Sequence, residues 1–424
     1  MINWSRAAQP LIVALAVTAA STACASHTAS PPGRAAAHTV SPVSPAGFGV
    51  VTRSAPRCTT AAAAAPALAA SVTATTTLQP LVSAAGTVSS APFGVAVTAD
   101  GRWGFASMGN RLGVFRLAPG RAPVLLRAIV LPAAPNAGIS LSPDGRLLLI
   151  ANEGTGAVVV SVAAAEAGAQ DAVLGVLSVP GEGLDGAIEV AVAPDGRYAF
   201  VSLESADEIA VFNLKAALAH GFGQGSYVGA VPTQVGPVGL AFAPGGRWLY
   251  STSEDRNSRS NQGTLEVINV ARAESDPAAS MVSRVRAGCN PVRVTTSANG
   301  RVVWVTARAS DALLAFSATA LRANPRSALL ADVPVGEAPV GLALVRNGSL
   351  IVVADSNRFN ASGQHASLAV VDVHAALAGR PALLGYLPAG MFPRDVAANP
   401  VGSSVLVANF ASSQLESVDV ADVP

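Results

Sequence analysis

The chain has 424 residues, of which 50% are hydrophobic and 12% charged, so it can bury a large core. Its 27 basic and 26 acidic residues leave a formal net charge of +1. That balance excludes the broad positive field of a protein that binds nucleic acid or an anionic membrane surface. Aromatic residues are scarce at 5%, whereas the abundant small and β-branched residues are typical of stacked sheets with frequent turns.

Residues 1–24 have the features of an export signal, because Arg6 precedes an apolar run at 11–20 that small residues follow. The run is about 10 residues long, and a membrane-spanning helix needs about 20. Ser21-Thr22-Ala23-Cys24 resembles a bacterial lipobox, with Ser where Leu is usual, and would make Cys24 the lipidated N-terminus. The alternative is ordinary cleavage after Ala23-Cys24-Ala25. The prediction is an exported protein, either a cell-surface lipoprotein or secreted.

Residues 25–77 consist mainly of Ala, Ser, Thr and Pro, a composition that favours a disordered tether ahead of a folded domain at 78–424. If Cys24 is lipidated, Cys58 and Cys289 remain as an even pair that could form a disulfide in an oxidising compartment. This bond would pin the tether to the fifth repeat. The alternative is two unpaired thiols.

Seven copies of one repeat fill the predicted domain. Each copy carries a turn related to Pro-Asp-Gly-Arg, in which Pro presets φ, Asp caps the turn and Gly adopts the left-handed conformation. The spacing of the turn glycines, 44 to 54 residues, is that of four-stranded propeller blades. These glycines are Gly101, Gly145, Gly196, Gly246, Gly300, Gly348 and Gly402.

The repeat predicts an all-β fold, a seven-bladed β-propeller of four-stranded antiparallel blades. The last repeat has only three strands before Val420, and a lone strand candidate at 81–88 precedes the first repeat. We therefore expect this N-terminal strand to complete the last blade and close the ring.

The strand entries Ala91-Pro92-Phe93-Gly94, Gly236-Pro237-Val238-Gly239 and Ala338-Pro339-Val340-Gly341 repeat one motif, and several copies end in a Val-Asp-Val segment such as 371–373. Over residues 78–424 this pattern resembles the YVTN family of β-propeller repeat proteins and, more loosely, the propeller-fold lactonase family. The resemblance implies the propeller fold. It is a weak guide to function, because the shared residues form turns and packing contacts.

One position near the channel entrance changes character between repeats. Four repeats have Gly there, whereas the third, fifth and seventh have a charged residue; the seven are Gly94, Gly138, Glu189, Gly239, Arg293, Gly341 and Asp395. A buried unpaired charge is costly. The three charged residues therefore either form a self-neutralising ion network or belong to a polar site, in which they would be the catalytic candidates.

Loops between the second and third strands should open on the same face as the channel entrance, and those of the fourth and sixth repeats are long. The ligand-binding candidates are Arg394, Asn152, Glu204, Asp255, Arg308, Asp355, Asn357 and Asn409. The alternative is a set of solvated loops. The sequence has no EF-hand, haem or phosphate-binding motif, so we predict no metal or other cofactor.

The sequence supports two functional hypotheses. The first is a monomeric, surface-tethered binding protein that recognises a protein, glycan or small molecule at the channel mouth and touches the membrane only through a lipid anchor. The second is a lactonase-like hydrolase that uses mouth carboxylates and an Arg. A redox propeller is a weaker third hypothesis, because haem ligands are missing. Fold alone does not choose among them.

Overall fold

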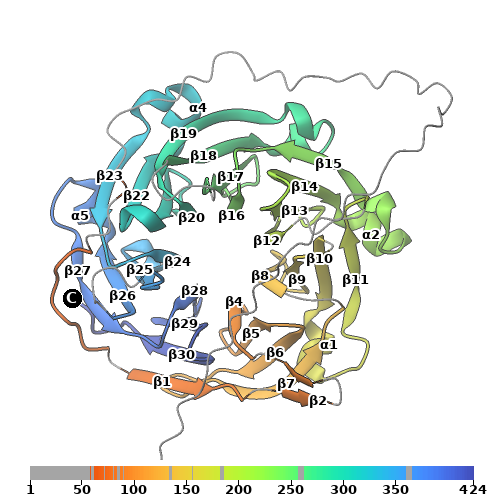
Figure 1. The fold of residues 1–424 in the computed structure, drawn as a ribbon, viewed down its shortest axis with the longest axis horizontal. Helices are drawn as coiled ribbons and strands as arrows, with labels where there is room; N and C mark the ends of the chain where they lie inside the picture. Colours follow the sequence, from red (N-terminus) through yellow and green to blue (C-terminus); the bar gives the residue numbers. More distant parts are fainter. Residues whose placement is uncertain are drawn as a thin grey trace, which may run out of the picture. The chain divides into compact units, whose positions relative to one another are not determined.

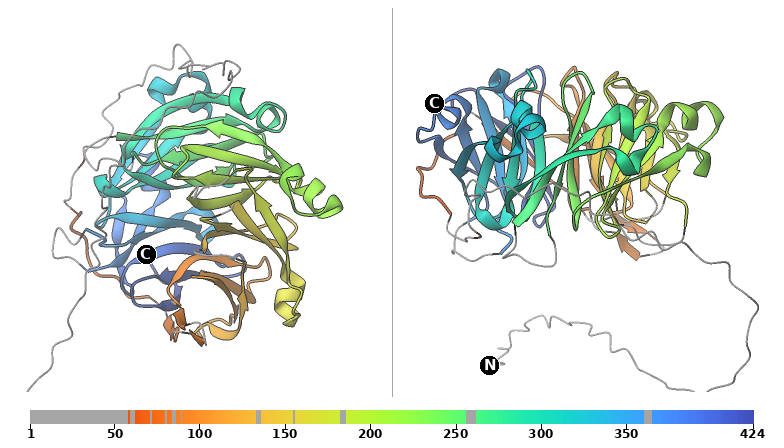
Figure 2. Two further views of the ribbon diagram at one scale, coloured as in Figure 1. Left: turned by 45° about the vertical axis from the view of Figure 1, so that its right-hand side comes forward. Right: turned by 90° about the horizontal axis from the view of Figure 1, so that it is seen from above.

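The computed structural model describes residue 58 and residues 62–70, 72–79, 81–83, 86–88, 90–132, 136–154, 156–181, 186–255, 262–359 and 365–424. These residues belong to one compact unit, in which seven antiparallel sheets are arranged around a central axis (Figure 1). Viewed from the side, the sheets stand next to one another like the blades of a propeller (Figure 2). The predicted all-β, seven-bladed fold is confirmed.

Six blades are formed by four consecutive strands, and the seventh combines three C-terminal strands with one N-terminal strand. In chain order the first three blades are β4 (Pro92–Val97), β5 (Trp103–Met108), β6 (Arg111–Arg116), β7 (Val124–Val130); β8 (Asn136–Leu141), β9 (Leu147–Asn152), β10 (Gly156–Ser161), β11 (Val173–Ser178); and β12 (Ala187–Val192), β13 (Tyr198–Leu203), β14 (Glu208–Asn213), β15 (Tyr227–Pro232).

The remaining blades follow the same order. They are β16 (Pro237–Phe242), β17 (Trp248–Ser253), β18 (Gln262–Asn269), β19 (Met281–Cys289); β20 (Pro291–Thr296), β21 (Val302–Ala307), β22 (Ala312–Ser317), β23 (Leu329–Pro334); β24 (Pro339–Val345), β25 (Leu350–Asp355), β26 (Ser367–Asp372), β27 (Leu383–Pro388); and β28 (Pro393–Ala398), β29 (Ser404–Asn409), β30 (Gln414–Asp419) with β1 (Val72–Thr77).

The turn between the first two strands of a blade has the predicted mechanism. In the second blade the Oδ1 atom of Asp144 accepts the N–H of Arg146 at 3.1 Å, and Gly145 has φ +69°. Gly101, Gly196, Gly246, Gly300 and Gly348 also have φ between 65° and 79°. A side chain at such a position would strain the backbone, so this glycine serves folding rather than chemistry.

Short helices lead from the third to the fourth strand in five blades, and their start explains the Val-Asp-Val segments. The last residue of the third strand is the N-cap: the side chain of Asp372, for example, accepts the N–H of Ala375 at 2.9 Å. The equivalent caps are Ser161, Asn213, Asn269 and Ser317. The helices are α1 (Val162–Ala167), α2 (Leu214–His220), α3 (Val270–Ala273), α4 (Ala318–Ala323) and α5 (Val373–Leu377).

Short 3₁₀ segments complete the connections. They are η1 (Gln224–Ser226), η2 (Pro277–Ala279), η3 (Arg308–Ser310), η4 (Pro325–Ser327) and η5 (Arg346–Gly348). The helices lie at the periphery of the ring, outside the strands that form the blades (Figure 1). Within the described residues, no helix combines the length and apolar character that crossing a membrane requires.

The hydrophobic core lies between neighbouring blades. One cluster joins the second and third blades through buried residues such as Leu149 and Val201, and another joins the fourth and fifth through Tyr250 and Val303. At the channel, the first strands approach so closely that a Cβ atom on Gly94 would lie 3.0 Å from the Cα of Gly138. Glycine at this position therefore permits the inner strands to pack.

Ring closure by an N-terminal strand is confirmed, but the strand is not the one expected. β1 pairs antiparallel with β30, from Val72 opposite Asp419 to Thr77 opposite Gln414. Residues 81–88, the expected closing strand, instead contain the hairpin of β2 (Leu81–Ser83) and β3 (Gly86–Val88). The Thr-rich sequence of β1 has high β-propensity but little hydrophobicity, which suits an outer strand that is half exposed.

The expected tether of residues 25–77 therefore needs correction at its C-terminal end, which contributes β1 to the domain. Residues 62–70 also contact the propeller, as the backbone bond from the N–H of Leu68 to the carbonyl of Tyr386 (2.7 Å) shows. A disulfide joins Cys58 to Cys289, with their Cα atoms 5.4 Å apart, so the expected disulfide forms. It attaches to the fourth blade rather than to the expected fifth, because Cys289 is the last residue of β19. The predicted signal sequence, including Cys24, and residues 25–57 lie outside the described residues.

Candidate functional site

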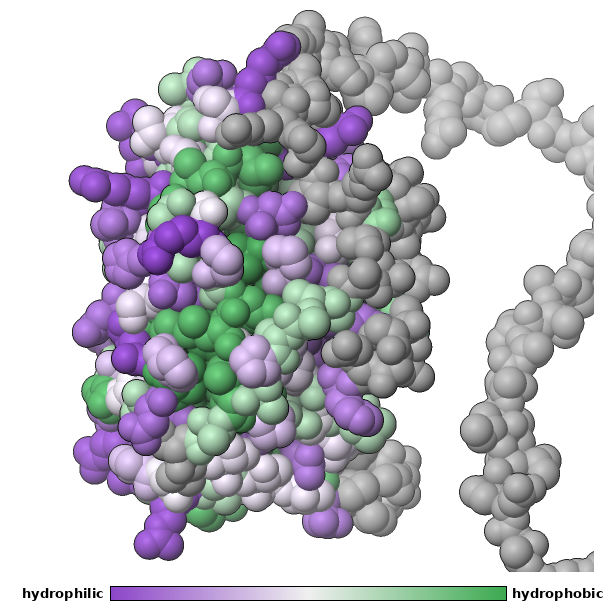
Figure 3. All heavy atoms as spheres, turned by 90° about the vertical axis from the view of Figure 1, so that its left-hand side faces the viewer, coloured by the Kyte–Doolittle hydropathy of each residue, from purple (hydrophilic) through white to green (hydrophobic). Residues whose placement is uncertain are grey.

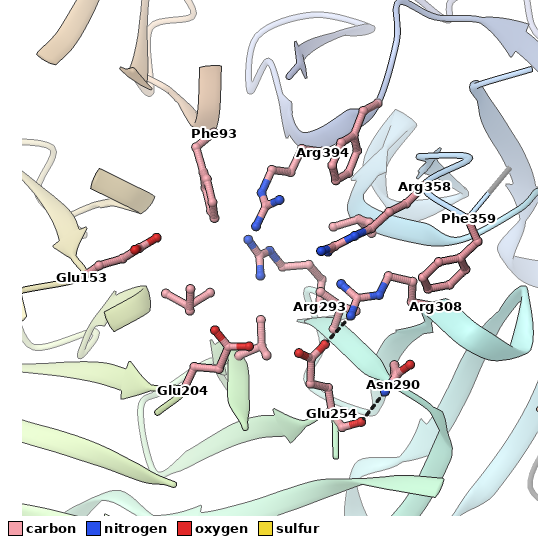
Figure 4. Close-up of a pocket in the computed structure, with 15 residues that line it drawn as sticks. Phe93, Glu153, Glu204, Glu254, Asn290, Arg293, Arg308, Arg358, Phe359 and Arg394 are labelled. Carbon is pink, nitrogen blue, oxygen red and sulfur yellow. Dashed lines mark hydrogen bonds and ion pairs between the residues drawn. The ribbon is translucent and has the colours of Figure 1, made fainter. Parts of the chain in front are cut away.

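A cavity of about 520 Å³ opens at one mouth of the central channel (Figure 4). Its volume is typical of a site for a small molecule. Two parts of the repeat supply its walls: the start of the first strand and the loop after the second strand. It is lined by Phe93, Glu153, Ile188, Glu204, Val238, Glu254, Asn290, Val292, Arg293, Arg308, Val340, Arg358, Phe359, Phe392 and Arg394.

The floor of the cavity is apolar. Ile188, Val238, Val292 and Val340 are buried, form one cluster and contact Phe392. Each of the four follows the first residue of its strand, so the ring symmetry of the propeller brings equivalent positions of four blades together. A ligand that reaches this floor would therefore place a hydrophobic group against it.

Four arginines, Arg293, Arg308, Arg358 and Arg394, gather on one side of the cavity, and their guanidinium groups point into it (Figure 4). Arg308 is paired with Glu254 at 2.6 Å between Nη2 and Oε2. Arg293 lies with its Nη2 3.3 Å from Oε2 of Glu189. All four of these side chains are largely buried, so removing one partner of either pair would leave the other without its direct partner in the interior.

Arg358 and Arg394 differ from the other two arginines. Within the described part of the chain, neither has a carboxylate at ion-pair distance. A buried Nε without a hydrogen-bond acceptor is a feature that Arg394 shares with Arg293 and Arg308. Burial, together with the positive charges of Arg293, Arg358 and Arg308, lowers the pKa of Arg394 to about 9. The site thus holds positive charge for which the described residues offer no direct partner.

Aromatic rings fix the position of Arg394. Its Cζ lies 3.6 Å from the centroid of the Phe93 ring and 5.6 Å from the centroids of both Phe392 and Phe410. Rings that stack on the face of a guanidinium leave its N–H groups, which lie in the plane, available to an acceptor. This arrangement can present a two-pronged donor to a carboxylate.

Carboxylates also line the cavity: Figure 4 shows Glu153 and Glu204 on the side away from Arg308 and Arg358, and Glu254 next to Arg308. Burial raises the pKa of Glu153, and the charge of Arg394 opposes this shift. Below the cavity, burial raises the pKa of Glu189 to about 7 although Arg293 favours its ionised form. The site therefore contains both cationic donors and carboxyl groups whose protonation is shifted toward neutral pH.

The structure brings only part of the predicted site together. Of the three catalytic candidates, Arg293 lines the cavity, whereas Glu189 and Asp395 do not. Glu189 contacts Arg293, and Oδ2 of Asp395 accepts the N–H of Val95 at 2.9 Å. Burial raises the pKa of Asp395, whereas the positive charge of Arg293 acts to lower it. Glu189 and Arg293 therefore form an ion pair, as the ion-network alternative predicts. Asp395 instead binds the backbone of the first blade.

Three of the eight ligand-binding candidates, Arg394, Glu204 and Arg308, line the cavity, and five do not. Asn152 is buried and donates to Pro132, and Asn409 is buried and donates to Glu416 at 2.7 Å. The others outside the lining are Asp255, Asp355 and Asn357, of which Asp355 is buried near Ser367. Several polar residues at strand ends thus brace the loops rather than face the channel.

The sequence prediction missed Phe93, Phe392 and Asn290. Glu153, Glu254, Arg358 and Phe359 lie in loops between second and third strands, which the sequence placed on this face. The sequence did contain a pattern that indicates which first-strand residues line the cavity. It lies at the position just before Gly94 and its equivalents in the other repeats. There the repeats have Phe93, Ala137, Ile188, Val238, Val292, Val340 and Arg394, and six of these seven line the cavity. In the parts of the chain described here, no cluster of His, Cys, Asp and Glu side chains is suited to a metal ion.

No curated protein matches the chain in sequence. Among solved structures it is similar to a chain of Kuenenia stuttgartiensis hydrazine synthase, with 16% identity and a TM-score of 0.62 over 79% of this chain and 97% of that one. A chain of a mitotic checkpoint complex is similar at 11% identity and a TM-score of 0.60, over 82% and 92%. At these identities the likeness concerns the fold alone. The family described as "Lactonase, 7-bladed beta-propeller" matches residues 73–362, more than half of the chain, so the protein belongs to this lactonase family of β-propellers.

Proposed function

We propose that the protein binds a small organic carboxylate in the cavity at the channel mouth. The observation that carries this proposal is Arg394, whose largely desolvated guanidinium is stacked on Phe93 and lacks an ion-pair partner among the described residues. A buried cation without a counter-ion is unfavourable, and an anionic ligand would remove that cost. Arg358, on the same side of the cavity, adds a second donor.

The apolar floor of the cavity favours carboxylates that also carry a hydrophobic group. Because Val238, Val292 and Val340 give the cavity an apolar surface beside its arginines, the complementary ligand has a hydrophobic body and a carboxylate at one end. Glu153, Glu204 and Glu254 would repel a ligand that is anionic over its whole surface. An aromatic or alicyclic monocarboxylate satisfies both constraints and fits within about 520 Å³.

Thermal-shift and calorimetric titrations with benzoate test the proposal, with neutral benzamide as the matched probe. Benzoate should raise the melting temperature and benzamide should not. Arg394→Gln should weaken benzoate binding by about 10- to 100-fold, because a hydrogen bond to a charged group contributes about 1.5–3 kcal/mol. Arg121→Gln, at an exposed position between β6 and β7, should leave binding unchanged. Equal binding of benzoate and benzamide, or full binding by Arg394→Gln, would contradict the proposal.

Hydrolysis of a lactone is the second candidate function, and membership of the lactonase family favours it. In such a reaction an Arg polarises the lactone carbonyl while a carboxylate accepts a proton from the attacking water. The ring C–O bond then breaks, and the departing oxygen takes up a proton to give a hydroxy acid. Glu153, whose pKa is raised by burial and which senses the charge of Arg394, is the carboxylate best suited to this role.

Acid release from δ-valerolactone, followed at constant pH, distinguishes hydrolysis from binding alone. Turnover that is lost in Glu153→Gln while benzoate binding remains would establish the enzyme. Glu204→Gln is the matched control, because it changes a second carboxylate of the same cavity wall. If neither the unmodified protein nor any variant accelerates hydrolysis, the binding function stands by itself.

We also propose that this function is exercised outside the cytoplasm, by a protein that is tethered through Cys24 or secreted. The predicted signal sequence supports this location. So does the Cys58–Cys289 disulfide, since such bonds persist in oxidising compartments. Incorporation of a labelled fatty acid in the native protein, and its loss in Cys24→Ser, would identify the lipoprotein. A soluble extracellular product without label would identify the secreted alternative.

A further inference from the structure

An N-terminal strap, consisting of Cys58 and residues 62–70, follows the outer rim of the propeller before β1 begins. Tyr386 of β27 holds it in three ways: its N–H donates to Pro66 (2.9 Å), its carbonyl accepts from Leu68 (2.7 Å), and its hydroxyl donates to Ala63 (2.6 Å). A Cβ atom on Gly385 would collide with the carbonyl of Pro66, so glycine keeps the rim open for the strap. The strap therefore has a defined docking site on the sixth blade.

The strap also covers apolar surface between the fifth and sixth blades. Figure 3 views this flank, which carries β23 and β27, and shows apolar surface among hydrophilic side chains. Ala63 and Ala64 border a groove of about 630 Å³ together with Leu330 and Leu383. The N–H of Ala63 donates to the carbonyl of Val335 at 2.8 Å, which ties the strap to the connection between these blades.

The disulfide anchors the strap at a second place, the end of β19 in the fourth blade. Cys58 is exposed, whereas Cys289 is fully buried and its N–H donates to Oγ of Ser310 at 2.9 Å. The two cysteines are 231 residues apart in sequence. One covalent bond thus joins the N-terminal segment to the junction between the fourth and fifth blades.

The residue after Cys289 belongs to the wall of the mouth cavity. Asn290 adopts the left-handed conformation (φ +47°), its Nδ2 donates to the carbonyl of Glu254 at 2.7 Å, and its own carbonyl accepts the N–H of Arg308 at 3.0 Å. Glu254 and Arg308 are themselves joined by their ion pair of 2.6 Å. Asn290, Glu254 and Arg308 thus each contact the other two, and Asn290 directly follows the disulfide-bonded Cys289.

We propose that the Cys58–Cys289 disulfide is a redox-sensitive latch that regulates the mouth cavity through Asn290. In the oxidised protein the latch holds the turn at Cys289-Asn290 and, through it, the wall of Glu254 and Arg308. In the reduced protein the turn loses its cross-link, the wall loosens, and affinity for a carboxylate falls. The effect on affinity rests on the function proposed above, whereas the effect on the wall does not.

The chemistry of reduction is defined by the exposure of the two sulfurs. A thiolate of a dithiol reductant attacks Sγ of exposed Cys58, forming a mixed disulfide, and buried Cys289 leaves as a thiolate that takes up a proton. The second thiol of the reductant then displaces Cys58 as a thiol. In total the protein gains two electrons and two protons, and the reductant becomes a cyclic disulfide.

Hydrogen–deuterium exchange of the full chain, oxidised and after treatment with dithiothreitol, tests the latch without a ligand. Peptides that contain Glu254, Asn290 and Arg308 should exchange several-fold faster in the reduced protein, while β8–β11 of the second blade should not change. Cys58→Ser should reproduce the reduced pattern without dithiothreitol. Tyr386→Phe, which removes one strap contact and keeps the disulfide, is the control and should retain the slow exchange at the wall.

Titration with benzoate on the same samples separates this inference from the proposed function. Weaker benzoate binding by the reduced protein supports both. Faster exchange at the wall in a protein that never binds benzoate would support the latch and contradict the proposed ligand class. Identical exchange in the oxidised and reduced proteins, or faster exchange that is uniform over all blades, would overturn the latch.

Discussion

The guanidinium carbon of Arg394 lies 3.6 Å from the centre of the Phe93 ring, although 301 positions separate the two residues in the chain. Phe93 is in β4 of the first blade and Arg394 is in β28 of the last, so this contact exists only because the ring closes. It holds the arginine at the edge of an apolar floor, and the remainder of the site is arranged around it.

Removal of this aromatic contact should weaken ligand binding more than it weakens the fold. Phe93→Leu keeps an apolar side chain but loses the cation–π interaction, which contributes about 0.5–2 kcal/mol. We expect benzoate affinity to fall by about 3- to 30-fold. Phe93→Tyr retains the ring and is the control. Calorimetry of both variants measures the effect, and an unchanged affinity in Phe93→Leu would mean that Arg394 is positioned by other contacts.

The pair of Glu254 and Arg308 should be strongly coupled. Each side chain is mostly buried and their ion pair measures 2.6 Å, so replacing one partner leaves the other charge uncompensated. Glu254→Gln and Arg308→Gln should each destabilise the protein by about 3–5 kcal/mol. The double variant should lose much less stability than the sum of the losses in the two single variants. Chemical denaturation of all four proteins completes this cycle, and additive losses would show that the pair is not coupled.

Asp311 should make stability depend on pH. Its side chain is buried, and this burial raises its pKa from 3.8 to about 6, with a further increase from the charge of Glu337. A carboxyl with a raised pKa binds more protons in the folded than in the unfolded state. Its contribution to stability is therefore greatest below pH 3.8 and is lost as the pH rises to about 6.

Asp311→Asn removes this dependence and suits both the left-handed backbone (φ +49°) and the 2.9 Å hydrogen bond from Ala338. The variant and the unmodified protein should be similarly stable near pH 4. Between pH 4 and 6 the variant should gain up to about 1.4 kcal/mol per pH unit relative to the unmodified protein. Denaturation at several pH values measures this difference in unfolding free energy between the variant and the unmodified protein. Asp207→Asn, at the equivalent turn of the third blade, controls for the substitution itself, and a gap that does not change with pH would contradict the prediction.

Loss of β1 should open the ring. A chain that begins at residue 78 lacks β1 and exposes the edge of β30, whereas a chain that begins at residue 72 keeps the strand. Because an unpaired edge strand both loses hydrogen bonds and invites association, we expect the shorter chain to melt several degrees lower and to aggregate. Both chains lack the disulfide, so their difference isolates β1. Equal melting temperatures and monomeric elution of both would refute this role.

The repeat was readable from the sequence because its signals are local. A left-handed glycine, an Asp or Asn that caps the turn and an N-cap at the end of the third strand all act within a few residues. The turn glycine is left-handed in six blades and the N-cap occurs in five, so the signals recur often enough to define the blade. The resemblance to propeller lactonases is confirmed at the level of the family, and the more specific resemblance to YVTN proteins stays a prediction.

The closing strand and the cavity depended on contacts between distant parts of the chain. β1 has no apolar pattern to reveal it, because it is a half-exposed outer strand whose partner, β30, lies at the other end of the chain. Asp355 and Asn409 were chosen for their polarity, but both are buried and brace loops. Residue type and position in a repeat determined the blades by themselves. Which side chains meet in the channel was decided by ring closure, because Phe93, Arg293 and Arg394 come from three different blades.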